Sequence, residues 1–115
     1  MNSNQIGLTI RSYTDTIAGA KPSELPKMID LYQKNKIQLQ ALVDWKNSMP
    51  SDPNSETNHL TDYMLVGEGR DKMAKILELT SLNPALKQLI TKRITELTEL
   101  DPTAQAVKTL WDSVQ

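Results

Sequence analysis

The chain has 115 residues, 38% of them hydrophobic, with a formal net charge of −1 and no cysteine. This length and composition fit one folded domain over residues 1–115 and argue against intrinsic disorder. The absence of cysteine excludes disulfides and cysteine-ligated zinc, and the near-neutral charge lacks the basic excess of proteins held to nucleic acid by phosphate contacts.

The first predicted helix covers residues 4–20. Its apolar residues recur at spacings of three and four, which places them on one helical face: Ile6, Ile10, Tyr13, Ile17 and Ala20. Gly7 and Gly19 lower the helical propensity, so we expect this helix to depend on docking against the rest of the chain. The Lys21-Pro22 step ends it.

The second predicted helix, over residues 24–49, is the longest, with Ser23 as its cap and Pro26 in its first turn. Its main apolar face carries Leu25, Met28, Ile29, Leu31, Tyr32, Leu39, Leu42 and Val43. Ile37, Ala41 and Trp45 follow an i, i+4, i+8 spacing and form a second stripe roughly opposite that face. A helix that is apolar on two sides either lies centrally in its domain or supplies a contact surface.

Both interpretations of the second stripe stay open at this stage. Tryptophan is enriched in binding hot spots, which favours a contact surface. A long helix wrapped on both sides within one small domain is the alternative. Ile37, Ala41 and Trp45 are therefore the candidate partner-binding residues.

Three Asx-Pro pairs mark expected helix starts: Asp52-Pro53, Asn83-Pro84 and Asp101-Pro102. An Asx side chain accepts hydrogen bonds from the amides of a first helical turn, and proline fits the next position because an N–H there would have no partner.

Residues 56–66 and 70–80 each show helical periodicity, but their apolar faces are about 140° out of phase. A single straight helix cannot bury both faces, so Gly67-Glu68-Gly69 predicts a break between two helices. A further amphipathic helix follows Asn83-Pro84 and runs to Leu100. The last helix follows Asp101-Pro102, and the two form a hairpin over residues 84–114.

These elements predict an all-α fold, a compact antiparallel helical bundle of five to six helices with a long second helix at or along its centre. Short links of two to eight residues are typical of antiparallel neighbours in such bundles.

Motifs for metal or ligand binding are weak. His59 is the only histidine, and a solvated or capping role is favoured over metal binding with Glu56 and Asp62. Residues 52–63 begin like a calcium loop but have threonine where the loop requires glycine, and tyrosine in place of its bidentate glutamate. Gly67–Lys72 is interpreted as a hinge rather than an anion-binding turn, because no strand precedes it and two carboxylates would repel an anion.

Catalysis is not expected. One histidine and no Gly-x-Ser-x-Gly turn leave no basis for a hydrolase triad. We therefore expect no enzymatic activity, no cofactor and no metal.

The leading functional hypothesis is a non-enzymatic protein-interaction module of adaptor, chaperone-like or inhibitor type, acting by self-association or by capture of a partner helix. The alternative is a nucleic-acid-associated regulator using the hairpin over 84–114, whose basic residues are Lys87, Lys92, Arg93 and Lys108. Residues 1–5 lack a signal-peptide pattern, and no stretch approaches the roughly 18 apolar residues that cross a bilayer. A cytoplasmic protein without membrane contact is expected, with secretion by a route without a cleaved signal as the alternative.

Overall fold

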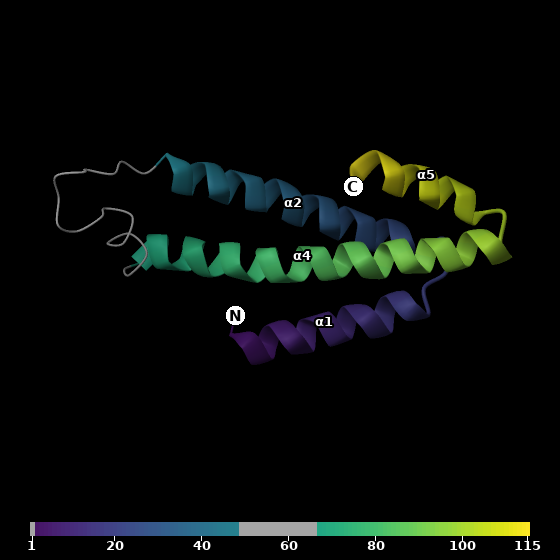
Figure 1. The fold of residues 1–115 in the computed structure, drawn as a ribbon, viewed down its shortest axis with the longest axis horizontal. Helices are drawn as coiled ribbons and strands as arrows, with labels where there is room; N and C mark the ends of the chain where they lie inside the picture. Colours follow the sequence, from purple (N-terminus) through teal and green to yellow (C-terminus); the bar gives the residue numbers. More distant parts are fainter. Residues whose placement is uncertain (1, 49–66) are drawn as a thin grey trace.

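The computed structural model describes residues 2–48 and 67–115, which form four helices (Figure 1): α1 (Ser3–Ala18), α2 (Leu25–Asn47), α4 (Gly67–Leu100) and α5 (Ala104–Val114). The all-α prediction is confirmed for these residues, which contain no strand. The described residues form four helices rather than the five expected for them, because the helices expected over 70–80 and after Asn83-Pro84 are one continuous helix, α4. The helix expected over 56–66 lies outside the described residues.

α4 is the central helix of the molecule. α1, α2 and α5 each pack against α4, and α5 also packs against α2. Figure 1 shows α1 on one side of α4 and the pair α2 and α5 on the other. The chain directions there make α2 and α5 antiparallel to α4, whereas α1 runs parallel to it. Of the two arrangements expected for the helix over 24–49, through the centre or along it, the structure shows the second, with α2 lying along the central helix α4.

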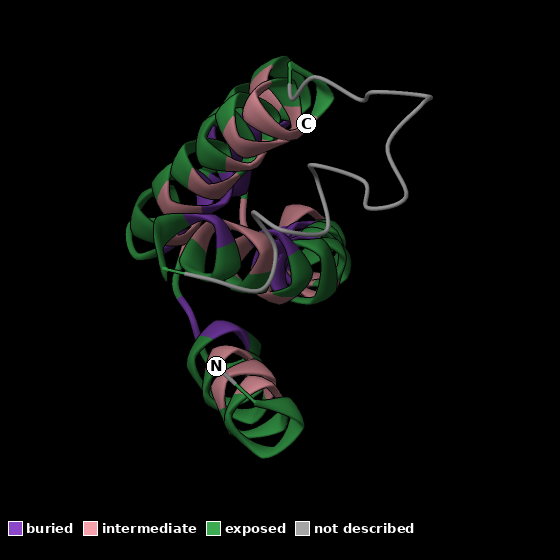
Figure 2. Cartoon of the chain, turned by 90° about the vertical axis from the view of Figure 1, so that its left-hand side faces the viewer, coloured by how far each residue is buried: buried purple, intermediate pink, exposed green. Residues whose placement is uncertain are grey.

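The helices form an elongated bundle with principal extents of 61 × 29 × 16 Å, which corrects the expectation of a compact shape. Its smallest extent is not far above the roughly 10–12 Å diameter of one helix with its side chains. Each outer helix therefore has few neighbours and leaves much of its surface uncovered (Figure 2). None of the helices in the described part combines the length and the apolar character required to span a bilayer.

Pro84 lies inside α4, so the prediction that Asn83-Pro84 starts a helix is wrong. A proline in a helix interior costs about 3 kcal/mol because it removes one hydrogen bond and its ring crowds the preceding turn. The helix on both sides of Pro84 buries four large side chains: Leu79, Leu82, Leu86 and Ile90. Each contributes roughly 1.5–3 kcal/mol on burial, so their sum exceeds the penalty of one proline.

One apolar core joins all four helices. Its buried members are Ile17, Ala20, Leu25, Ile29, Tyr32, Leu86, Ile90, Ile94, Leu97, Ala104, Val107 and Trp111. On α2 these residues all lie in the first third of the helix, and no residue from Gln33 to Ser48 is fully buried. The second half of α2 is therefore the less covered half, and the predicted stripe lies there.

α1 docks on α4 mainly through its carboxyl end. Ile17 is fully buried, and Ala20 is buried just after the helix. The Arg93 Nε of α4 donates a hydrogen bond to the Ala20 carbonyl oxygen at 2.9 Å, and its Nη1 lies 3.4 Å from a Glu96 carboxylate oxygen. α1 contributes one fully buried residue of its own to this contact, and its expected dependence on docking stays a prediction.

The turns at the helix ends differ in detail from the prediction. Ser23 does not cap α2; Glu24 occupies the cap position without a capping bond, and its carboxylate accepts from the Lys21 backbone N–H at 3.0 Å. The hairpin turn at Asp101-Pro102 separates α4 from α5, as predicted. The Asp101 carboxylate accepts from the Thr103 backbone N–H at 2.9 Å, one residue before α5 begins.

Candidate interaction surfaces

The outer stripe, defined as Ile37, Ala41 and Trp45, lies in the second half of α2. Ile37 is 63% exposed and Ala41 is exposed, so neither belongs to the core of the described chain. Trp45 is half-buried, and the Lys72 Nζ of α4 lies 4.9 Å from its ring centroid. That distance allows a cation–π contact worth about 0.5–1 kcal/mol at an exposed site. The structure thus exposes Ile37 and Ala41 together and places Trp45 against α4.

Polar groups border the outer stripe on α2. Lys34 Nζ lies 2.8 Å from the Asp30 carboxylate, and this hydrogen bond raises the pKa of Lys34. One turn further on, the Gln40 side-chain amide donates to Asp44 at 2.9 Å. Both pairs join residues four apart on the same helix, so they satisfy one another locally. An apolar surface with such a polar border resembles the core and rim of a protein interface.

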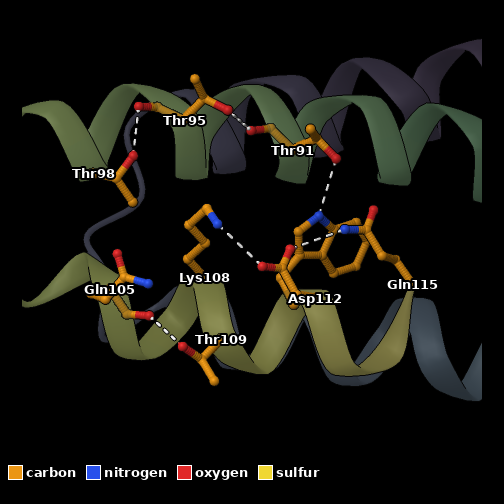
Figure 3. A network of polar contacts seen from close by, with 9 residues as sticks. Thr91, Thr95, Thr98, Gln105, Lys108, Thr109, Asp112 and Gln115 are labelled. Carbon is orange, nitrogen blue, oxygen red and sulfur yellow. Dashed lines mark hydrogen bonds and ion pairs between the residues drawn. The ribbon is translucent and has the colours of Figure 1, made fainter.

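A second surface, which sequence reasoning missed, lies between α2 and α4. α5 covers one part of the groove between these two helices. The Trp111 ring meets Tyr32 of α2 edge to face, with ring centroids 4.9 Å apart, and its indole N–H donates to the Thr91 hydroxyl of α4 at 3.1 Å. Figure 3 shows this bond running from α5 to Thr91 on α4.

The groove continues beyond the end of α5 as a hollow of about 430 Å³, here called the open groove. Its lining residues are Tyr32, Lys36 and Leu39 of α2 and Leu79, Thr80, Asn83, Pro84 and Lys87 of α4. Lys36 Nζ lies 3.4 Å from the Val114 carbonyl oxygen and so marks where α5 ends and the open groove begins.

Asn83 is an unusual residue in this setting. Its side chain is buried, with 7% exposure, and its Nδ2 donates to the Tyr32 backbone carbonyl at 3.4 Å. Its Oδ1 is also buried and has no hydrogen-bond partner among the described residues. Asn83 continues the series of buried positions of α4, which is the signal that places it in the interior rather than at a helix start.

The basic residues proposed for nucleic-acid contact do not form one surface. Lys87 lines the open groove, whereas Lys92 is five residues further along α4 and therefore about 140° away around the helix axis. Arg93 bonds Ala20 and Glu96, and Lys108 forms an ion pair with Asp112 at 3.2 Å. Two of the four cations are thus already paired within the protein.

The glycine-rich segment expected as a hinge forms the first turns of α4. The helix begins at Gly67, whose φ of 51° is in the left-handed region that glycine adopts readily, and Gly69 is buried inside the helix. Glu68 and Lys72 form an ion pair at 3.4 Å. His59, Glu56, Asp62 and the loop over 52–63 lie outside the described residues.

No group of three or more potential metal ligands was found among residues 2–48 and 67–115. Comparisons with models of known protein families, with curated proteins and with solved structures found no match.

Proposed function

We propose that the chain is a non-enzymatic protein-interaction module, of adaptor, chaperone-like or inhibitor type, that binds through the outer stripe of α2. The observation that carries this proposal is the 63% exposure of Ile37. Burying an aliphatic side chain of this size stabilises a complex by roughly 1.5–3 kcal/mol. Single exposed aliphatic residues are ordinary, but Ile37 is followed at helical spacing by Ala41 and Trp45.

Two occupants fit a stripe on one helix: the same stripe of a second copy, or an apolar helix of another protein. In both cases two helices pack side by side, and the polar pairs beside the stripe remain at the solvated border. We place this activity in the cytoplasm and assign it no cofactor, metal or membrane contact.

The alternative, a nucleic-acid-associated regulator acting through residues 84–114, has weaker support. Arg93 and Lys108 each form an ion pair with a carboxylate of the same chain, and Lys87 and Lys92 lie on different sides of α4. A phosphate backbone is best met by cations that share one face. Salt-sensitive binding of DNA or RNA would favour this alternative over the interaction module.

Ile37→Glu tests the proposal, and Leu8→Glu on α1 is the matched control, since Leu8 is 64% exposed. Light scattering after size exclusion would report self-association, and pull-down from a native lysate would report a partner. We expect both variants to retain wild-type helix content. Ile37→Glu should weaken the complex at least about tenfold, which corresponds to 1.4 kcal/mol, and Leu8→Glu should leave it intact.

The proposal is wrong if the wild-type chain stays monomeric and the pull-down recovers no protein whose binding Ile37→Glu weakens. Equal loss of the complex in the two variants would also contradict it, because that result would assign the effect to added charge rather than to the outer stripe.

A further inference from the structure

We propose that the open groove is a second binding site, whose occupant is an acidic amphipathic helix presented by a partner protein. This site is separate from the outer stripe and does not depend on the proposed function of that stripe. It lies between α2 and α4, next to the end of α5, and has a volume of about 430 Å³.

α5 occupies the neighbouring part of the same groove and shows which shape of occupant the groove accepts. α5 is an amphipathic helix of 11 residues that buries Ala104, Val107 and Trp111. It packs against both α2 and α4. The groove between these helices therefore already accepts a helix, and α2 and α4 continue side by side beyond the end of α5 in Figure 1.

The floor of the open groove supplies apolar surface for such an occupant. Leu79 is buried at its base, Leu39 is half-buried, and the ring of Pro84 is exposed along α4. An amphipathic helix binds a groove of this kind through apolar side chains at i, i+3, i+4 and i+7. Leu39 and Pro84 lie on opposite walls, so a helix between them contacts both.

Two lysines, one on each wall, make the open groove basic. Lys36 on α2 and Lys87 on α4 both line the open groove, and no carboxylate is among its described lining residues. Lys36 contacts the Val114 carbonyl oxygen, but an ammonium group has three donors and can bond a carboxylate as well. Acidic side chains flanking the apolar face of the occupant would complement both walls.

Asn83 and Pro84 also lie at this place, and Asn83 carries an acceptor left unsatisfied by the described part of the chain. Asn83 Oδ1 is buried without a partner among the described residues, and Asn83 lines the open groove. Pro84 has no N–H, so the Thr80 carbonyl oxygen lacks the usual helical donor four residues on.

The test selects helices from a display library in which a constant apolar face is flanked by randomised positions. The wild-type chain should enrich flanking Glu and Asp. Lys36→Glu with Lys87→Glu should weaken the selected acidic helices about tenfold or more and should instead enrich Lys and Arg. Lys27→Glu with Lys92→Glu is the matched control, because both lysines are exposed outside the open groove, and it should select as the wild type does.

The selected helix should shift the methyl resonances of Leu39 and Leu79 in solution, and raising the salt concentration should weaken its binding. Ile37→Glu should leave this binding unchanged, so failure here is distinguishable from failure of the outer stripe. The proposal is overturned if the selected helices show no preference for acidic residues, or if their resonance shifts are confined to the outer stripe. It is also overturned if a nucleic acid or a second copy of the chain, rather than an acidic helix, binds the wild type at Leu39 and Leu79.

Discussion

At the scale of single residues, Asp101 shows how one side chain fixes the path of the chain between two helices. Its Oδ1 accepts from the Thr103 backbone N–H at 2.9 Å and from the Thr103 hydroxyl at 2.8 Å. Both bonds favour the ionised carboxylate, the backbone bond most, and they hold the pKa of Asp101 below its ordinary value of 3.8. The sequence identified Asp101 as a helix-start residue, and the structure places its bond in the turn just before α5.

The lowered pKa of Asp101 predicts a pH-dependent contribution to stability. A carboxyl whose folded-state pKa is depressed stabilises the folded protein above its unfolded-state pKa, and this contribution is lost as pH falls through the folded-state pKa. Asp101→Asn keeps an acceptor but cannot ionise. We expect the wild type to be the more stable protein at pH 7 and its advantage to disappear below pH 3.8. Denaturant titrations of both proteins between pH 7 and pH 2 would check this, and a constant difference would contradict it.

At the scale of elements, α4 is a helix in which the burial of apolar side chains outweighs the helix-breaking tendency of Pro84. Pro84 lies within a helix that continues from Gly67 to Leu100. The proline still weakens the helix locally, because the Thr80 carbonyl loses its donor. Leu79 and Leu86, buried on either side, keep the helix continuous against its neighbours.

Pro84→Ala should therefore raise the free energy of unfolding by about 1–3 kcal/mol, since alanine restores the missing donor and has the highest helical propensity. Pro26→Ala is the matched control, because Pro26 occupies the first turn of α2, where proline is tolerated. We expect Pro26→Ala to change the free energy of unfolding by less than about 1 kcal/mol, a range that includes a slight decrease. Equal changes in the free energy of unfolding at the two positions, measured by denaturant unfolding, would contradict this prediction, because Pro84 would then cost no more inside α4 than Pro26 costs in the first turn of α2.

The helices themselves were largely predictable because apolar periodicity and turn residues act within a few positions. α1 and α2 agree with their predicted ranges to within two residues, and Asp101-Pro102 separates the last two helices. The prediction that Asn83-Pro84 starts a helix failed, because an Asn-Pro pair is compatible both with a helix start and with a buried helix interior. Only the tertiary contacts of Asn83 and its neighbours distinguish these two cases.

The candidate sites were predictable in part. Helical spacing grouped Ile37 with Ala41, and the structure exposes both residues, while their role in binding stays a prediction. The open groove needed the pairing of α2 with α4, which brings Lys36 and Lys87 to opposite walls. These residues are 51 positions apart, and no local pattern relates them. Leu77 is 65% exposed, because Ile76 and Leu79 carry the buried side of α4 at this point.

At the scale of the whole molecule, α1 is the least integrated helix. It packs against α4, and Figure 2 shows it apart from the other helices with exposed residues over most of its surface. Burial of Tyr13 and the nearby charge of Glu78 raise the pKa of Tyr13 at this contact. Few buried contacts imply that such a helix opens more readily than the core it lies on.

α1 should therefore detach in a sub-global opening before the molecule unfolds, and Arg93 should control that opening. Arg93→Ala removes a 2.9 Å bond from Nε to the Ala20 carbonyl oxygen, a contact worth about 1–2 kcal/mol at a partly exposed site. Native-state hydrogen exchange should show the amides of α1 exchanging about 5–30 times faster in this variant, with little change in α2, α4 and α5. Lys92→Ala, at the exposed neighbouring position, should leave the exchange of α1 unaltered. Uniform acceleration of all four helices in Arg93→Ala would mean instead that α1 opens only together with the core.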